Sequence, residues 1–457
     1  RKTSTINVSK WINANSSIDF EFSQLRQSGA KLMAMPTATT SLIKGQAIAY
    51  LPNPTNYQTD NWSAAYNWRN EKGRYSVSYT GSSFRDAYDA VYFQPVIRYS
   101  SSTLAIPSGT TQAISTAPGN LLNQIHATAG YDFSKTRKFT SNFSYGQGTQ
   151  NQAFNADTYT GLLVNTPYSG PTSAQAKVDT THLDMKLTEQ YSPELVLSAM
   201  LRYDERLNKT ASNLYNFYAI NLSDKYGTNY ANAPFSNRKN QVEFAGDYKL
   251  NADQKLRLTL GHEGYSRWCQ NYAATSGGAM ANCVVATGHG EDKLEATFRQ
   301  KLTPESDLRV GYVFSDRKTT SNVNAIPSII GTNGNIPLGS ATGSTSIAGL
   351  NGGDFQGFYP YFSASRRQDA FKVGSTSQIN DQWAIGLSGK FGYDRYYDSN
   401  FGVQSGNSQS LNADLSYAYK ENANLFGYIT GQRMQRDMFN KTTFGSPAAQ
   451  VGWFNRL

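Results

Sequence analysis

QVEFAGDYKL-NADQ-KLRLTLG, residues 241–261, is the stretch that decides the fold. Apolar and polar residues alternate along it with a period of two, which places them on opposite faces of a β-strand. The alternation pauses at Asn251–Gln254, a polar segment typical of a turn, and then resumes. Two alternating strands joined by a short turn form an antiparallel hairpin. One face of this hairpin carries Val242, Phe244, Gly246, Tyr248, Leu250, Leu256, Leu258 and Leu260, and the other carries Gln241, Glu243, Ala245, Asp247, Lys249, Arg257, Thr259 and Gly261.

The same unit recurs along the chain, and no segment shows the 3.6-residue period of a helix. About eight hairpins, and therefore about sixteen strands, are expected from this pattern. The further turns are expected at Asn13–Asn15, Asn70–Gly73, Ser134–Thr136, Ser192–Glu194, Thr303–Glu305, Asn380–Gln382 and Lys420–Asn422.

Long polar stretches, rich in Gly, Ser, Thr, Asn and Pro, separate the hairpins at residues 85–120, 147–176, 205–237 and 316–365. Short turns at one end and long loops at the other are typical of outer-membrane barrels, where they form the periplasmic and extracellular ends. We therefore expect an all-β fold, a large antiparallel transmembrane β-barrel that forms a single domain over residues 1–457.

The composition agrees with a barrel and excludes a helical membrane protein. Charged residues make up 16% of the chain, aromatic residues 13%, and the mean hydropathy is −0.54. A helical span needs about 20 mostly apolar residues in a row, and the sequence contains no such run. The net charge of +9 is scattered over strands and loops without a basic block, so we expect no nucleic-acid partner.

The parity of the strands predicts which side chains face lipid. A sheet in lipid must pair every backbone group internally, and closed barrels then turn apolar residues outward and polar residues inward. Aromatic residues near strand ends, including Tyr66, Trp68, Tyr131, Phe133 and Tyr203, suit the interfacial girdles. The residues predicted to face the lumen are His182, Asp184, Lys186, Arg202, Asp204, Glu243, Asp247, Lys249, Arg257, Glu295, Arg299, Lys301, Arg309 and Asp414.

Both signs of charge occur together in this predicted lumen set. A pore that selects ions with a ring of like charge would carry mainly one sign. Mixed charge suits either a wet, weakly selective channel or a lumen that holds another protein through hydrogen bonds and ion pairs. Strand parity leaves both alternatives open.

Two cysteines, Cys269 and Cys283, lie in a polar stretch between two strands. A disulfide between them is expected in an exported protein and would contribute roughly 3 kcal/mol against unfolding. The alternative is two free thiols in a loop. No CxxCH motif occurs, so we expect this chain to attach no c-type haem of its own.

No catalytic or metal-binding pattern stands out. His126, His182, His262 and His289 are isolated from further ligands at metal-site spacing. The sequence lacks a GxSxG elbow and a phosphate-binding loop, and the Asp204–Glu205 pair is interpreted as solvated charge at a strand-to-loop junction. We therefore expect neither an enzyme nor a cofactor site.

Several collinear segments resemble one family, the MtrB/PioB outer-membrane barrels. The first is LPNPTNYQTDNW (residues 51–62), followed by a hairpin and YTGSSF (79–84). The order in the family is similar, with a proline-bearing Tyr-x-Thr-Asp segment, a hairpin and then Tyr-x-Gly-Ser-x-Phe. Further matching segments are GYDFSKT (130–136), SYGQGTQNQAF (144–154), KVDTTH (177–182), RYDER (202–206), NKT (208–210), NRKNQ (237–241), DY (247–248) and LNADLSY (411–417).

The resemblance implies a function for the predicted lumen. Barrels of this family sheath a decahaem c-type cytochrome and so form an electron conduit through the outer membrane, for metal reduction or iron oxidation. It implies that the haems belong to a periplasmic multihaem cytochrome inside the barrel, and that a second multihaem cytochrome or a mineral can dock on the long loops. The rival interpretation is a passive diffusion porin for small polar solutes, because sixteen strands is a porin number.

The resemblance also implies a larger barrel of roughly twenty-six strands, within the range known for bacterial barrels. Some members carry an N-terminal CxxC, which this sequence lacks. The chain begins with Arg1, has no export signal and ends in VGWFNRL at Leu457 without a terminal aromatic strand. We therefore expect the sequence to be part of a longer barrel.

Overall fold

The computed structural model describes residues 1–36, 48–93, 112–154, 171–217, 228–269, 286–321, 358–359, 364–397, 401–419, 423–443 and 450–456. Within these ranges the regular secondary structure consists of β-strands. No helix among the described residues is long and apolar enough to cross a membrane.

Sixteen strands of 12 to 22 residues form one continuous antiparallel sheet, which confirms the predicted fold class and strand number. Each long strand pairs with its neighbours in chain order, so the sheet is a meander. The strands are β1 (Lys2–Asn13), β2 (Ser16–Pro36), β3 (Ile48–Arg69), β4 (Gly73–Asp86), β7 (Asn120–Asp132), β8 (Arg137–Gln150), β9 (Ala176–Gln190), β10 (Leu195–Asn208), β13 (Phe235–Lys249), β14 (Gln254–Cys269), β15 (Ala286–Thr303), β16 (Ser306–Ser321), β18 (Arg366–Gln378), β19 (Trp383–Tyr396), β20 (Phe401–Tyr419) and β21 (Ala423–Thr443).

Six shorter strands accompany the sheet in the described part of the chain. β22 pairs with β21, and the two-residue β17 runs parallel to β20. Two small hairpins, β5–β6 and β11–β12, lie within the longer connections. Their bounds are β5 (Ala90–Phe93), β6 (Gln112–Ser115), β11 (Leu214–Phe217), β12 (Thr228–Ala231), β17 (Phe358–Tyr359) and β22 (Gln450–Arg456).

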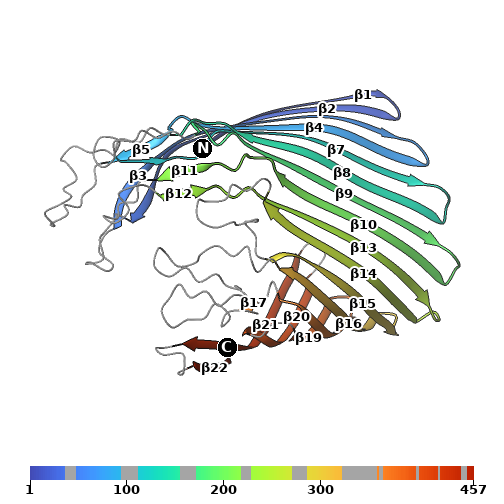
Figure 1. Cartoon of the computed structure of the whole chain (residues 1–457). Helices are drawn as coiled ribbons and strands as arrows, with labels where there is room; N and C mark the ends of the chain where they lie inside the picture. The colour runs from blue at the N-terminus through green and yellow to red at the C-terminus, as the bar shows by residue number, and fades with distance from the viewer. Residues whose placement is uncertain are drawn as a thin grey trace.

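The short turns between the long strands lie together at one end of the sheet, here called the turn end (Figure 1). The described turns contain two to four residues, and a side chain within the turn closes several of them. The Asn70 Oδ1 atom accepts hydrogen bonds from the backbone N–H groups of Lys72 and Gly73, at 3.0 and 2.7 Å, and Asn380 caps its turn in the same way. Asn and Ser favour turns because their side chains can satisfy nearby backbone donors.

The predicted turn positions are confirmed wherever the structure describes them. The exception is Lys420–Asn422, which lies outside the described residues, between the end of β20 and the start of β21.

The longer connections lie at the opposite end, the loop end (Figure 1). The predicted starts of the loops were wrong by two to six residues, because β4, β8, β10 and β16 continue to Asp86, Gln150, Asn208 and Ser321. Polar residues there still pair with the neighbouring strand, so the strands extend past the apolar part of their sequences. The connection from β19 to β20 is short, since only residues 397–400 separate these strands.

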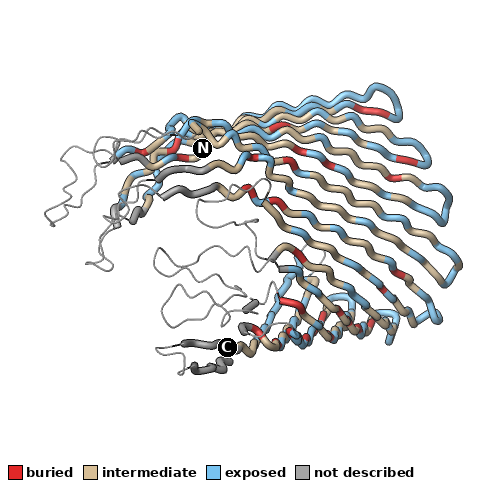
Figure 2. The backbone as a smooth tube through the Cα atoms, in the orientation of Figure 1, coloured by how far each residue is buried: buried red, intermediate tan, exposed pale blue. Residues whose placement is uncertain are grey.

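The sheet curves into a wall, with β1 at one edge and β21, which pairs with the short β22, at the other (Figure 1). Among the described residues, no pairing joins β1 to β21 or β22. Buried residues are scattered singly along the strands (Figure 2), and the buried apolar cluster of Ala364, Tyr396 and Val403 lies at the loop end. A single-layer sheet has no second layer to pack against, so its apolar face needs lipid in place of a protein core.

Candidate functional site

The strand register sorts the side chains of the wall onto two faces. In the hairpin of β13 and β14, Phe244 lies opposite Leu260 and Tyr248 opposite Leu256, whereas Asp247 lies opposite Arg257. Directly opposite residues share a face. Following such pairs from strand to strand defines an apolar face and a charged face for the whole sheet.

Residues on the charged face are more buried than those on the apolar face. Ala245, Thr259, Val313, Ser315 and Ala370 all lie on it and are 1 to 7% exposed. On the apolar face, by contrast, Phe244, Leu260, Val310 and Phe371 are 44 to 58% exposed. Side chains converge on the concave side of a curved sheet and diverge on the convex side, so the charged face is the inner face of the wall.

The apolar face carries a band of apolar residues that ends before the loop end. On β10 the alternate residues from Leu195 to Tyr203 are apolar, and Glu205 follows on the same face. Nine residues at about 3.3 Å each, tilted by about 40°, span roughly 20 Å, close to the height of a lipid-facing band. Aromatic pairs mark its turn end, including Trp68–Tyr75 and Trp383–Tyr417, whose ring centroids are 5.3 and 4.3 Å apart.

Beyond this band, the outer face carries ion pairs at the loop end. Glu205 contacts Arg238 at 2.6 Å, and Asp179 contacts Lys209 at 2.5 Å. The hydrogen bond from Lys209 to Asp179 raises the pKa of the Lys209 ammonium. The interpretation of Asp204 and Glu205 as solvated junction charges was therefore wrong, because both lie within β10, on opposite faces. Glu205 forms an ion pair with Arg238, and Asp204 forms a hydrogen bond with the His182 ring.

All fourteen residues predicted to face the lumen lie on the charged face. The structure brings several of them into direct contact. Arg202 donates two hydrogen bonds to Asp184 Oδ2, at 3.1 and 2.9 Å, and the His182 ring lies 2.5 Å from Asp204. Arg257 lies 2.6 Å from Asp247 and 4.0 Å from Glu243.

Other predicted residues pair with partners that the sequence analysis missed. Glu295 contacts both Lys293 and Lys372 at 2.7 Å, and Arg299 and Arg309 converge on Asp307 at 2.7 and 3.0 Å. Strand parity alone would have placed Lys293 and Asp307 on this face. Further ion pairs on it are Lys239–Glu263, His289–Glu263, Arg366–Glu291 and Arg366–Asp394.

Four predicted residues, Lys186, Lys249, Lys301 and Asp414, form no ion pair within the part of the chain that the structure describes. Cys269 is disulfide-bonded, and its expected partner, Cys283, lies outside the described residues. Groups of three or more His, Cys, Asp or Glu side chains that could hold a metal ion are absent from the described residues. The charged face therefore offers a broad polar surface of ion pairs with some unpaired charges between them.

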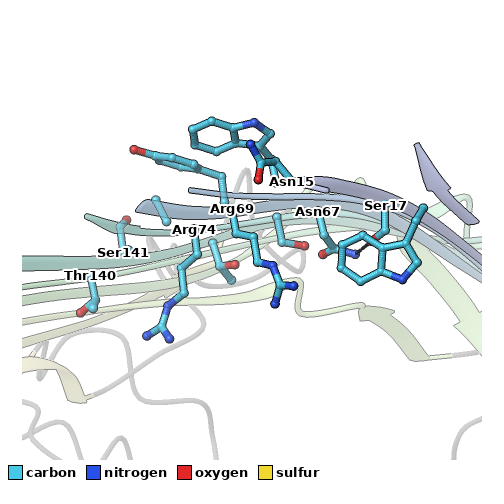
Figure 3. Close-up of a pocket in the computed structure, with 14 residues that line it drawn as sticks. Asn15, Ser17, Asn67, Arg69, Arg74, Thr140 and Ser141 are labelled. Carbon is cyan, nitrogen blue, oxygen red and sulfur yellow. Dashed lines mark hydrogen bonds between the residues drawn. The ribbon is translucent and has the colours of Figure 1, made fainter. Parts of the chain in front are cut away.

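A shallow hollow lies at the turn end of β3 and β4, and its lining includes Arg69, Arg74 and Asn67. Arg69 and Arg74 are directly opposite each other in the register. Both guanidinium groups extend to the same side of the sheet (Figure 3). Two like charges thus face each other here on the charged face.

Comparison with known proteins agrees with the architecture. The whole chain, residues 1–457, matches the family model described as outer membrane beta-barrel porin, MtrB/PioB. Over 207 residues the chain is 25% identical to the outer membrane protein MtrB of Shewanella baltica (strain OS185). That alignment covers 45% of this chain and 28% of the relative, so it spans less than a third of that protein.

This chain resembles solved structures in its fold alone. The copper transporter OprC superposes with a TM-score of 0.50 at 9% identity, over 95% of this chain and 59% of that one. The siderophore receptor PiuA from Acinetobacter baumannii gives the same TM-score at 12% identity, over 97% of this chain and 63% of that one. The curved meander is therefore that of large outer-membrane barrels.

Proposed function

The chain belongs to the MtrB/PioB family and is an integral protein of the bacterial outer membrane, and from this premise we propose that it sheaths a multihaem c-type cytochrome. The complex would conduct electrons across the membrane for extracellular electron transfer. In this proposal the wall itself performs no chemistry, and every haem belongs to the enclosed partner.

The physical problem that such a wall solves is insulation. The hydrocarbon core of a bilayer is about 30 Å thick, and a chain of haems must cross it inside a protein whose polar surface is costly to place in lipid. A curved sheet that turns Phe244 and Leu260 to lipid and Asp247 and Arg257 inward separates the two environments. Sixteen strands about 4.8 Å apart and tilted by about 40° give a wall roughly 100 Å around.

The observation that carries the proposal is the mixed sign of the inner face. From β9 to β19 carboxylates and cations occur together and many of them pair, as in Asp184–Arg202 and Lys372–Glu295. An ion-selective pore would carry rings of one sign. A surface with both signs and many hydrogen-bonding groups instead resembles the polar surface of a protein interface.

The loop end supports the second part of the proposal. The strands continue past the apolar band at this end, where an extracellular multihaem cytochrome or a mineral would dock. Electrons could then leave the cell for metal reduction or enter it from iron oxidation.

The test is to purify the affinity-tagged protein from its native host and to record the haem absorbance of the fraction that contains it. We expect c-type haem to elute with the protein at a fixed ratio. A colourless preparation that conducts ions in a planar bilayer would contradict the proposal. It would favour a passive diffusion porin, for which sixteen strands is a common number.

A further inference from the structure

We infer that the turn end of the charged face carries a docking strip for a carboxylate-rich surface of the enclosed protein. The strip is the cationic row Lys249, Lys255, Arg299 and Arg309, on four adjacent strands, β13 to β16. The inference rests on the proposed function, since it specifies the chemistry by which the inner wall holds its partner.

The register makes the row continuous. Lys249 lies directly opposite Lys255, Lys255 opposite Arg299, and Arg299 opposite Arg309. Adjacent strands lie about 4.8 Å apart, so the four side chains project along a line of roughly 14 Å. Beyond Arg309 the next directly opposite residue is Gly374, where the row ends.

The charge around the row is unbalanced. Arg257 and Lys301 lie two positions from the row along the same strands and on the same face, which gives six cations in all. The carboxylates at equivalent positions in the strands are those of Asp247 and Asp307. These strand residues carry an excess of four positive charges. The neighbouring turns add the carboxylates of Asp253, two residues before Lys255, and of Glu194, whose backbone oxygen accepts a hydrogen bond from the Lys249 N–H group, so the local excess is two. Asp307 is committed to Arg299 and Arg309, Asp247 is committed to Arg257, and in the described part of the chain Lys249 and Lys255 form no ion pair.

This excess costs folding free energy, because like charges directly opposite each other destabilise a sheet. Elsewhere on the charged face opposite charges often meet, as Asp184 does Arg202, and like charges meet in pairs rather than in a row of four. Two such pairs are Lys372–Lys390 and Glu263–Glu291, where Lys372 is balanced by Glu295 and Glu263 by Lys239. Arg69 opposite Arg74 is a further like-charge pair at the turn end. Row cations that stay exposed, such as Arg299 and Arg309 at 50 and 54%, remain able to bind an anion.

The shape of the row favours a protein surface over a small anion. A phosphate site gathers donors around one point, whereas these side chains lie along a line on an open wall. The row also faces away from the apolar face, so the headgroups of surrounding lipids do not reach it. Extended charge complementarity of this kind is typical of interfaces between proteins.

The test compares two charge-reversed barrels, each purified with its cytochrome from the native host. The variant Lys249→Glu/Lys255→Glu alters the row, and the matched control Lys138→Glu/Lys390→Glu alters two exposed lysines of the same face that lie outside the row and outside the predicted lumen set. We expect the row variant to retain at least tenfold less haem per barrel at 150 mM NaCl than wild type, with retention by the control within twofold of wild type. We also expect Lys255→Glu alone to resist urea at least as well as wild type, since the new carboxylate lies directly opposite Arg299.

The outcomes separate the two proposals. A wild-type barrel without haem would overturn the proposed function and this inference with it. A haem-bearing wild type whose row variant retains equal haem would overturn the inference alone. Inorganic phosphate that binds the haem-free wild type but not the row variant, with equal haem retention in both, would show a small-anion site and would also overturn it.

Discussion

Asp307 is the carboxylate that holds the cationic row together, and its neutralisation gives a sharp test of the charged face. Its side chain is 7% exposed, accepts hydrogen bonds from Arg309 and Thr376, and forms an ion pair with Arg299. Asp307→Asn keeps the shape of the side chain and removes its charge. Arg299 and Arg309, which lie directly opposite each other, would then repel without a counter-charge between them.

The magnitude follows from the two ion pairs. Hydrogen bonds to charged groups contribute about 1.5–3 kcal/mol each. The two guanidinium groups are 50 and 54% exposed, so solvent screening reduces their contribution by about half. We therefore expect Asp307→Asn to lower the free energy of unfolding by about 1.5–3 kcal/mol.

The assay is equilibrium unfolding in urea in detergent micelles, followed by the fluorescence of the six tryptophans. Asp414→Asn is the matched control, because Asp414 lies on the same face, is exposed and forms no ion pair among the described residues. We expect the control to lie within about 0.5 kcal/mol of wild type. Equal stability of the Asp307 and Asp414 variants would refute the reasoning that the row depends on one carboxylate.

Two further predictions test the faces and the packing of the sheet. Leu387→Arg places a charge on the apolar face and should lower the folding stability in lipid by about 2–4 kcal/mol, whereas Ser388→Arg, on the charged face, should lower it little. Refolding into lipid vesicles measures both variants, and equal yields would mean that the faces are wrongly assigned. A Cβ atom on Gly81 would lie 2.1 Å from the Trp62 ring, so Gly81→Ala should lower stability by about 1–3 kcal/mol. A Cβ atom on Gly427 would meet no atom within 4 Å, so Gly427→Ala is the control in the same urea titration. Equal stability of the two alanine variants would contradict the close packing of Trp62 against Gly81.

The sequence alone was enough to predict the number of long strands, the turns that the structure describes and the face of each predicted lumen residue. The physical reason is that side chains alternate across a strand with a period of two, so the face of Asp247 follows from that of Phe244. Turns were predictable because Asn70 and Asn380 satisfy backbone donors within their own turns. The family followed from short collinear motifs and is confirmed by the match over the whole chain.

The ends of the strands were less predictable. At the loop end the sequence becomes polar before the strand ends, so Glu205 was assigned to a junction although it lies within β10. Backbone pairing continues there because Arg238 and other partners on neighbouring strands are also polar. The alternation of apolar and polar residues indicates which part of a strand contacts lipid. A strand that extends beyond the membrane no longer shows that alternation.

Only the tertiary structure decided which charges meet. Lys249 and Lys255 belong to one hairpin, but Arg299 and Arg309 join their row through the register between β14 and β15, across the connection at residues 270–285. Alternation fixes the face of each residue without fixing its height on the wall, and a shift of two residues would preserve the faces and break the row. The sequence therefore determined a membrane wall with a charged inner face, and the pairing of its strands determined where that face is left with positive charge.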